Sequence, residues 1–419
     1  MRSPLLSPVP AALLAAVLVA STPARADIVT DWYDAGYALT NANPPGGVFS
    51  TRALALAHLA IHDAVNAVER RYESYGAGDA QAASGASLEA AAAGAAHAVY
   101  SLLYPNQKTL LDTTLAAQLA KLPGGASAAA NAQGVALGRS IGERLVAERR
   151  DDGSATPVAF TPTGKPGAWK PTPPDYAPNA VARWPRVKPL IIRSVGDFLP
   201  PPPPPVTSAT YAKAIEEVRK LGGRNSTERT ADQTATAIFW VAPTYHPYAE
   251  VAKAESKARQ LSVHDNARLF ALLNVASFDT YLAGYHAKIV YDQLRPVSAI
   301  REAASLGNPG IVPDASWEPL LQTPASQDYV SGHAVQAGGY ERVAQAVFGG
   351  DELKASASAV WPAGAVRRSY TRWTQLTQED NDARIWGGIH TRIATDAGDE
   401  IGRQVGDYLV KHALRPVSR

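Results

Sequence analysis

Residues 383–390 read ARIWGGIH, and they are predicted to form a sharp backbone turn between two helices. A helical pattern covers residues 376–385, and a second one covers residues 390–411. Between them stand Gly387 and Gly388, and glycine permits a sharp backbone turn. The arginine and the histidine of this stretch can then face one centre. The planar guanidinium fork of arginine suits an oxyanion.

Two further clusters precede this stretch. Lys288 and Arg295 are seven residues apart, close to two helical turns, which predicts that both cations project from one helix face. Ser331-Gly332-His333 stands at a predicted helix start, where free N–H groups attract anions and a histidine can move a proton. Taken singly, these patterns also fit solvated surface cations and an ordinary capped helix. Together they indicate one oxyanion pocket.

The order of the three clusters resembles the vanadium-dependent haloperoxidases and the type 2 phosphatidic acid phosphatase superfamily that shares their site. The motifs read KIVYDQLRP (288–296), YVSGHA (329–334) and ARIWGGIH (383–390). Thirty-three residues separate Pro296 from Val330 and 49 separate His333 from Ala383, and both gaps fit the family. The likeness to the bacterial secreted branch covers most of the chain after residue 26.

This resemblance implies a role for each residue of the motifs. His390 would bond vanadium or, in a phosphatase, attack phosphorus, and His333 would be the acid-base residue. Vanadate or phosphate would be held by Lys288, Arg295, Ser331, Gly332 and Arg384. In a haloperoxidase the partners would be hydrogen peroxide, a halide and a small organic acceptor. A homo-oligomer is one option that the sequence leaves open.

The motifs depart from the family pattern at several positions. Val330 replaces a proline, and Ala383 replaces a serine. Phosphatases carry an aspartate four residues after the nucleophilic histidine, but this chain has Ala394 there, with Asp396 as the nearest carboxylate. Ser326 stands where haloperoxidases often place an aromatic residue or histidine near the halide. These departures favour halide oxidation over phosphate ester hydrolysis and leave halide preference open.

Composition limits the class of protein. Residues 1–26 are predicted to be a signal peptide, since Arg2 precedes a short apolar run and Ala24-Arg25-Ala26 fits a cleavage site. The export signal predicts a periplasmic or secreted protein. The whole chain has 40 basic and 38 acidic residues, which argues against nucleic-acid and membrane-surface binding. It has no cysteine, and its one methionine is Met1, so the mature chain would lack easily oxidised sulfur.

Alanine-rich periodic segments predict an all-α fold of helical bundles. A proline- and glycine-rich connector, roughly residues 151–206, divides an N-terminal half (27–206) from a C-terminal half (207–419) that holds the site. A long helix over residues 265–294 is expected to bend near Gly284. No alternating strand pattern stands out. Other predicted helices cover residues 52–70, 87–103, 108–122, 127–150, 208–221, 228–241 and 331–348.

Other functions remain in competition with halide oxidation. The first alternative is a phosphomonoesterase with a phosphohistidine at His390, and the second is an oxyanion-binding protein without turnover. His58 and His62, four residues apart, have a spacing that can bind zinc. Their helix is otherwise apolar and no HExxH pattern is present, so packed histidines are the favoured interpretation.

Overall fold

The computed structural model describes residues 27–43, 47–76, 85–124, 127–243, 245–361 and 366–417. The signal peptide predicted for residues 1–26 lies outside them. Helices dominate the described part, which confirms the all-α prediction. The α-helices are α1 (Ile28–Ala42), α2 (Val48–Val68), α3 (Leu88–Leu103), α4 (Lys108–Leu119), α5 (Ala128–Glu148), α6 (Ala209–Leu221), α7 (Ala231–Phe239), α8 (Tyr245–Arg259), α9 (Val263–Tyr291), α10 (Pro296–Arg301), α11 (Gly332–Phe348), α12 (Trp373–Trp386) and α13 (Arg392–His412).

Short polar side chains fix where many of these helices begin. Ser87, Ser208, Ser262 and Thr391 each precede a helix and accept a hydrogen bond from a backbone N–H of its first turn. Such N-caps satisfy donors that have no partner inside the helix. The predicted helix starts are therefore accurate to a few residues. Within the described ranges, short 3-10 turns also occur: η1 (Pro105–Gln107), η3 (Trp184–Arg186), η4 (Val195–Phe198) and η5 (Ala303–Leu306).

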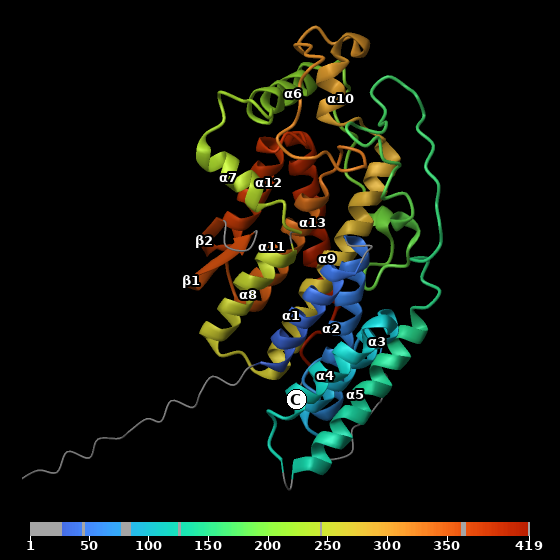
Figure 1. Cartoon of the computed structure of the whole chain (residues 1–419), viewed down its shortest axis with the longest axis vertical. Coiled ribbons are helices and arrows are strands. Elements are labelled where there is room, and N and C mark those ends of the chain that lie inside the picture. The colour runs from blue at the N-terminus through green and yellow to red at the C-terminus, as the bar shows by residue number, and fades with distance from the viewer. Residues whose placement is uncertain are drawn as a thin grey trace, which may run out of the picture.

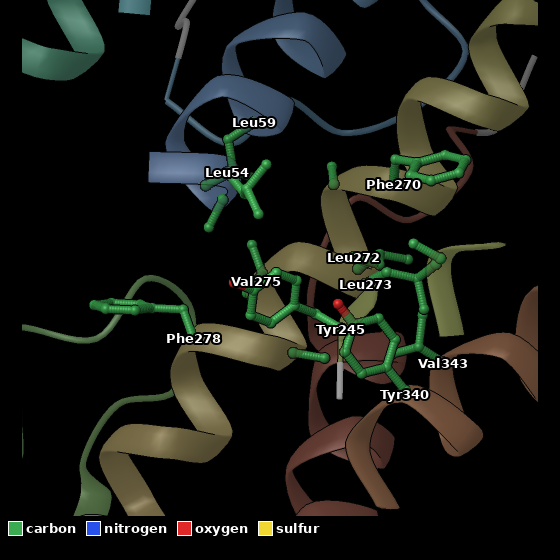
Figure 2. Packing of buried hydrophobic residues seen from close by; sticks show 14 of the residues in the cluster. Leu54, Leu59, Tyr245, Phe270, Leu272, Leu273, Val275, Phe278, Tyr340 and Val343 are labelled. Atoms are coloured by element: carbon green, nitrogen blue, oxygen red, sulfur yellow. The ribbon is translucent and has the colours of Figure 1, made fainter. Parts of the chain in front are cut away.

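Helix α9 is the centre of the molecule. It packs against α2 on one side and against α11 and α13 on the other, and it is buried around most of its circumference, as expected of a helix apolar on all faces. The residues labelled in Figure 2 form part of this core: Leu54, Leu59, Tyr245, Phe270, Leu272, Leu273, Val275, Phe278, Tyr340 and Val343. Helices from both predicted halves thus share one hydrophobic core, and the boundary at residue 206 stays a prediction.

The sequence predicts a break or a bend at Gly284, and the structure shows no break there. Helix α9 runs without interruption from Val263 to Tyr291. A Cβ on Gly284 would lie 2.8 Å from Cγ1 of Val335, so this glycine lets α11 approach α9 closely. The helix ends at Asp292, which adopts a left-handed conformation, before Pro296 is reached.

The connector follows one side of the molecule from α5 to α6 (Figure 1). It is fixed to α9 by Asp279, a fully buried carboxylate that accepts hydrogen bonds from the backbone N–H groups of Leu190, Ile191 and Ile192 at 2.8–3.0 Å. Further along, the hydroxyl of Tyr329 donates to the carbonyl of Pro201 within the proline run (2.7 Å). The connector is therefore tied to the elements that carry the predicted motifs.

A β-hairpin lies between α11 and α12, where no strand was predicted. Strands β1 (Glu352–Trp361) and β2 (Val366–Arg372) pair antiparallel, and β1 contacts α8. In β2 the side chains of Arg368 and Tyr370 both reach Glu379 of α12. Strand pairing and these contacts stabilise the hairpin. Its sequence alternates small and polar residues, so it gives little hydrophobic signal for a strand.

Candidate active site

Lys288 and Arg295 come together, but not along one helix face as predicted. Lys288 is in the last turn of α9, which ends at Tyr291, and Arg295 is the N-cap residue of α10. The chain turns between them, and each side chain is 1% exposed. The ammonium of Lys288 donates to the carbonyl oxygens of Gln327 and Asp328, the latter at 3.4 Å. Burial, and then the charge of Arg295, hold the pKa of Lys288 well below its usual value.

Arg295 links the first motif to the third motif and to the loop before α11 through its guanidinium. Its Nε donates to the carbonyl of Ser326 (2.6 Å) and its Nη2 to the hydroxyl of the same residue (3.0 Å). Its Nη1 donates to the carbonyl of Ile389 (2.6 Å) and lies 2.9 Å from Nε2 of His390. Burial lowers the pKa of Arg295 to about 10, so the side chain stays charged at neutral pH.

Ser331 and Gly332 open α11, as the sequence indicated. The hydroxyl of Ser331 accepts from the N–H of Ala334 (3.4 Å), and the N–H of Ser331 donates to the carbonyl of Ala394 in α13 (2.8 Å). That contact ties the start of α11 to the start of α13, so the second and third motifs are joined through the backbone. The N–H groups of the first turn have no carbonyl within the helix and suit an anion.

His333 stands in the first turn of α11 at the edge of the site. Its Nδ1 lies 3.1 Å from a carboxylate oxygen of Asp380, a fully buried residue of α12. The His333 side chain is 23% exposed. Burial and the charge of Arg384 lower the pKa of His333, while Asp380 opposes them. The bond to the carboxylate assigns the proton to Nδ1 and leaves Nε2 to exchange protons.

Arg384 reaches the site from α12. Its Nη2 donates to the carbonyl of Trp240, and its Nε lies 3.4 Å from the carboxylate of Asp380 without the direction of a hydrogen bond. The backbone turns directly after this helix, where Gly388 has φ +77°. A Cβ there would lie 2.3 Å from the carbonyl oxygen of Gly222, so the turn requires glycine for both conformation and space.

His390 is held by a carboxylate that sequence reasoning did not identify. Its Nδ1 lies 2.7 Å from Asp328, and the hydroxyl of Thr391 donates to the second oxygen of the same carboxylate (2.7 Å). The proton therefore belongs on Nδ1, and the lone pair of Nε2 faces Arg295. Burial, followed by the charges of Arg295, Lys288 and Arg384, holds the pKa of His390 well below its usual value, which keeps the imidazole neutral.

The site carries more positive than negative charge. Lys288, Arg295 and Arg384 are each at most 2% exposed, and the carboxylates that interact with them are Asp328 and Asp380. Burial raises the pKa of Asp328 to about 6, and Arg295 works against this rise. Buried charges are costly unless they are compensated. A bound oxyanion would supply the missing negative charge, so these residues fit vanadate or phosphate.

A cavity of about 500 Å³ connects the site with the surface. His333, Arg384 and Ile389 form its inner end. Its outer walls come from the connector and from the loop before α11. The position of His333 between the buried cations and this cavity places its imidazole on the route that a small reactant would take.

Sequence reasoning missed the two carboxylates because neither lies at the position where the family pattern puts one. Asp328 precedes Ser331 by three residues, just outside the quoted motif, and Asp380 is one helical turn before Arg384. The position examined instead, Ala394, is apolar, and Asp396 is exposed. An acidic residue directly preceding the Ser-Gly-His motif was the available signal for Asp328.

His58 and His62, the pair with a spacing that can bind zinc, are packed side chains. His58 is fully buried between the rings of Tyr33 and Phe270, and burial lowers its pKa to about 3. His62 lies 3.0 Å from the carbonyl of Glu73. No group of three or more His, Cys, Asp or Glu side chains arranged for a metal ion occurs among the described residues.

Comparison with known proteins supports this reading of the fold. Residues 268–419 match the family described as the VCPO second helical-bundle domain. Among solved structures, a bacterial vanadium-dependent iodoperoxidase superposes with a TM-score of 0.79 at 23% identity, over 93% of this chain and 98% of that chain. A holo-type bacterial vanadium-dependent chloroperoxidase gives 0.71 at 19% identity, over 86% and 90% of the two chains. Its apo-type counterpart gives 0.69 at 18%, over 87% and 93%. No curated protein sequence matches.

The helical bundles and the buried cationic site define the class first: this is a helical protein with the vanadium haloperoxidase fold. Residues 268–419, which contain all three motifs, match the family model of the VCPO second helical-bundle domain. The family recognised from the motifs is thereby confirmed. In the described residues, no helix is both long enough and apolar enough to span a bilayer.

Proposed function

We propose that this protein is a vanadate-dependent haloperoxidase that oxidises a halide with hydrogen peroxide to a hypohalous species. The observation that carries the proposal is neutral His390, whose Nε2 lies 2.9 Å from Arg295, in a site with three buried basic side chains and, among the described residues, two carboxylates beside them. The solved structures with the same fold are named for iodide and chloride oxidation, which supports the activity class but not a halide.

The residues of the site divide the work as follows. Vanadate bound there would supply a Lewis-acidic centre that activates hydrogen peroxide toward halide without a redox change of its own. Nε2 of His390 would hold it, while the cations and the first-turn N–H of Gly332 would neutralise and orient its oxygens. His333 would give and take protons at Nε2, because its Nδ1 is bonded to Asp380.

Histidine variants test this assignment. His390→Ala should abolish vanadate binding measured by equilibrium dialysis, and His333→Ala should keep much of that binding while losing most iodide oxidation, about a hundredfold or more. His412→Ala, an exposed histidine of α13, is the matched control and should match the wild type. Full activity in both site variants would contradict the roles.

Phosphate ester hydrolysis is the second candidate, and Asp328 favours it. The missing aspartate at position 394 argued against a phosphatase, but Asp328 orients His390 from another direction. The test compares iodide or bromide oxidation, with vanadate and peroxide, against hydrolysis of p-nitrophenyl phosphate without vanadate. Halide oxidation restored to apo-protein by vanadate supports the haloperoxidase. Hydrolysis that vanadate inhibits supports the phosphatase, and saturable binding without either turnover leaves an oxyanion-binding protein.

The remaining sequence-based expectations about the setting of the enzyme stay predictions. Export to the periplasm or beyond rests on the signal peptide of residues 1–26, and a homo-oligomer stays one option. Secretion would show as loss of that segment from the protein recovered outside the cytoplasm.

A further inference from the structure

Arg384 is held in its direction by a loop outside its own helix. Among the described residues, the carbonyl of Trp240 is the one acceptor that hydrogen-bonds the Arg384 side chain, and its Nε has no hydrogen-bond partner. Trp240 directly follows α7, and its side chain is fully buried. A guanidinium binds an oxyanion well only when its planar fork points at it. The position of the Trp240 backbone therefore sets how Arg384 faces the oxyanion site.

Glu379 of α12 holds the ring of this tryptophan. The indole Nε1 of Trp240 donates to Oε1 of Glu379 (3.0 Å), and the hydroxyl of Tyr370 donates to the same oxygen (2.8 Å). The second carboxylate oxygen accepts from Nη2 of Arg368 (2.6 Å). The Glu379 side chain is 18% exposed, so its hydrogen bonds lie in a mostly dry environment, where they are stronger than in water. One carboxylate thus joins the loop after α7 to strand β2.

The β-hairpin strengthens this support. Nη1 of Arg368 also donates to Asp232 in the first turn of α7 (2.7 Å). Strand β2, α7 and α12 contact one another, and they lie side by side in Figure 1. The ring of Trp240 packs against Tyr248 of α8, with the ring centroids 6.1 Å apart. A series of hydrogen bonds therefore runs from the hairpin through the carboxylate to Trp240 and on to Arg384.

We infer that Glu379 is a positioning residue of the oxyanion site: it fixes Trp240, so that the Trp240 carbonyl aims the Arg384 guanidinium at the bound anion. The inference rests on the oxyanion site of the proposed function and applies to vanadate and phosphate alike. Glu379 acts through Trp240 and not by contact with the anion. The hairpin between α11 and α12 thereby takes part in anion binding.

Vanadate affinity, measured by equilibrium dialysis without peroxide, provides the first test. Glu379→Gln leaves a weaker acceptor for the indole, and Trp240→Phe removes the indole donor but keeps an aromatic ring. Each variant should raise the vanadate Kd by about three- to tenfold, because Arg384 loses part of its fixed direction. Urea unfolding of each variant gives its free energy of unfolding, so that the Kd is compared between folded proteins.

The direction of the change separates positioning from other roles. Removal of a negative charge near an anion site would by itself strengthen vanadate binding. A merely structural role would lower the free energy of unfolding and leave the Kd of the folded protein unchanged. An unchanged or lower Kd in Glu379→Gln, or in Trp240→Phe, would overturn the inference.

A double variant tests whether the effect passes through Arg384. Arg384→Met removes the guanidinium, while two buried basic side chains and His390 remain to bind vanadate. In this background Glu379→Gln should change the Kd by less than about twofold, because the group that Glu379 positions is absent. If the loss seen in the wild-type background persists here, Glu379 acts by another route and the inference fails.

Asp351→Asn is the matched control. The Asp351 carboxylate accepts from the N–H (2.9 Å) and the hydroxyl (2.7 Å) of Thr374, and so joins the start of the hairpin to the first turn of α12 without a bond to Trp240. This variant should lower the free energy of unfolding and leave the vanadate Kd within about twofold of the wild type. A rise equal to that of Glu379→Gln would mean that any loosening of the hairpin weakens binding, which contradicts a specific role for Glu379.

Iodide oxidation separates failure of the inference from failure of the proposed function. A wild type that binds vanadate but oxidises no iodide with peroxide contradicts the proposed function, and the Kd of the variants still decides the role of Glu379. A wild type that oxidises iodide, with variants that keep its Kd, overturns the positioning role alone. A wild type that binds no vanadate overturns both.

Discussion

The two histidines of the site are each paired with a buried carboxylate, yet their surroundings differ. His390 is enclosed: its side chain is 5% exposed, Asp328 holds Nδ1, and Arg295 faces Nε2. His333 is bonded to Asp380 in the same way, but its side chain is 23% exposed and borders the cavity. One pair is built into the protein interior, and the other stands between the interior and the substrate route.

This difference shows how a histidine paired with a carboxylate can serve either as a ligand or nucleophile, or as a group that transfers protons. A neutral imidazole fixed on both sides keeps a lone pair aimed at one point, which suits a ligand or a nucleophile. An imidazole that borders an open cavity can exchange protons with solvent and reactants. The following variants should separate the two purposes.

The largest effect is expected at the enclosed pair. Asp328→Asn removes the charge that fixes the His390 tautomer and compensates Lys288 and Arg295. Vanadate affinity should fall by about 10- to 100-fold, as for outer-sphere partners of metal ligands. Halide oxidation should fall at least as much. Equilibrium dialysis and steady-state assays measure the two quantities, and Asp175→Asn at the cavity rim is the control. Unchanged vanadate affinity would show that His390 does not depend on Asp328.

Asp380→Asn should give a smaller and differently distributed effect. Turnover should fall by roughly tenfold, because His333 loses the carboxylate charge that favours its tautomer while its own imidazole remains. Vanadate affinity should stay equal or increase, since Arg384 is freed from a carboxylate 3.4 Å away. The measurement is kcat against vanadate Kd in one preparation. A parallel loss of both would remove the distinction between the two histidines.

Ser326→Ala should have the smallest effect. It removes one hydrogen bond to Arg295 Nη2, while the bond from Nε to the backbone carbonyl of residue 326 remains. The loss should be about 0.5–1.5 kcal/mol in vanadate binding, or about two- to tenfold in Kd. Ser316→Ala in the exposed part of the same loop is the control. A loss as large as that of Asp328→Asn would mean that Ser326 positions Arg295 far more strongly than its neighbours do.

The sequence predicted most helices because their signals are local. Caps such as Ser87 and apolar periodicity lie within each segment, so starts and types were recovered. The helix is not broken at Gly284, and a glycine that permits close packing cannot be told from a flexible one without its neighbour Val335. The β-hairpin was missed because contacts with α8 and α12 stabilise it more than its own pattern does.

The motif residues of the site were recognisable for a similar reason. Each motif is a short run whose spacing is visible in the sequence, and the structure brings all three runs together. Asp328 and Asp380 were not recognisable, since their roles depend on how the loop before α11 and the helix α12 meet in space. Lys288 and Arg295 lie close together, as their seven-residue spacing predicted. They do not share one helix face, because the helix ends between them.

The connector between the halves has a consequence for how this enzyme could diversify. Five of the residues around the cavity belong to it, and they lie outside the 268–419 unit that carries the buried cations and both histidines. Under the proposed function, mutations there could exchange one acceptor for another while the centre that would generate the oxidant stays intact. If the connector residues of the cavity and the residues of the buried centre vary independently, related enzymes could share a reaction and differ in their products.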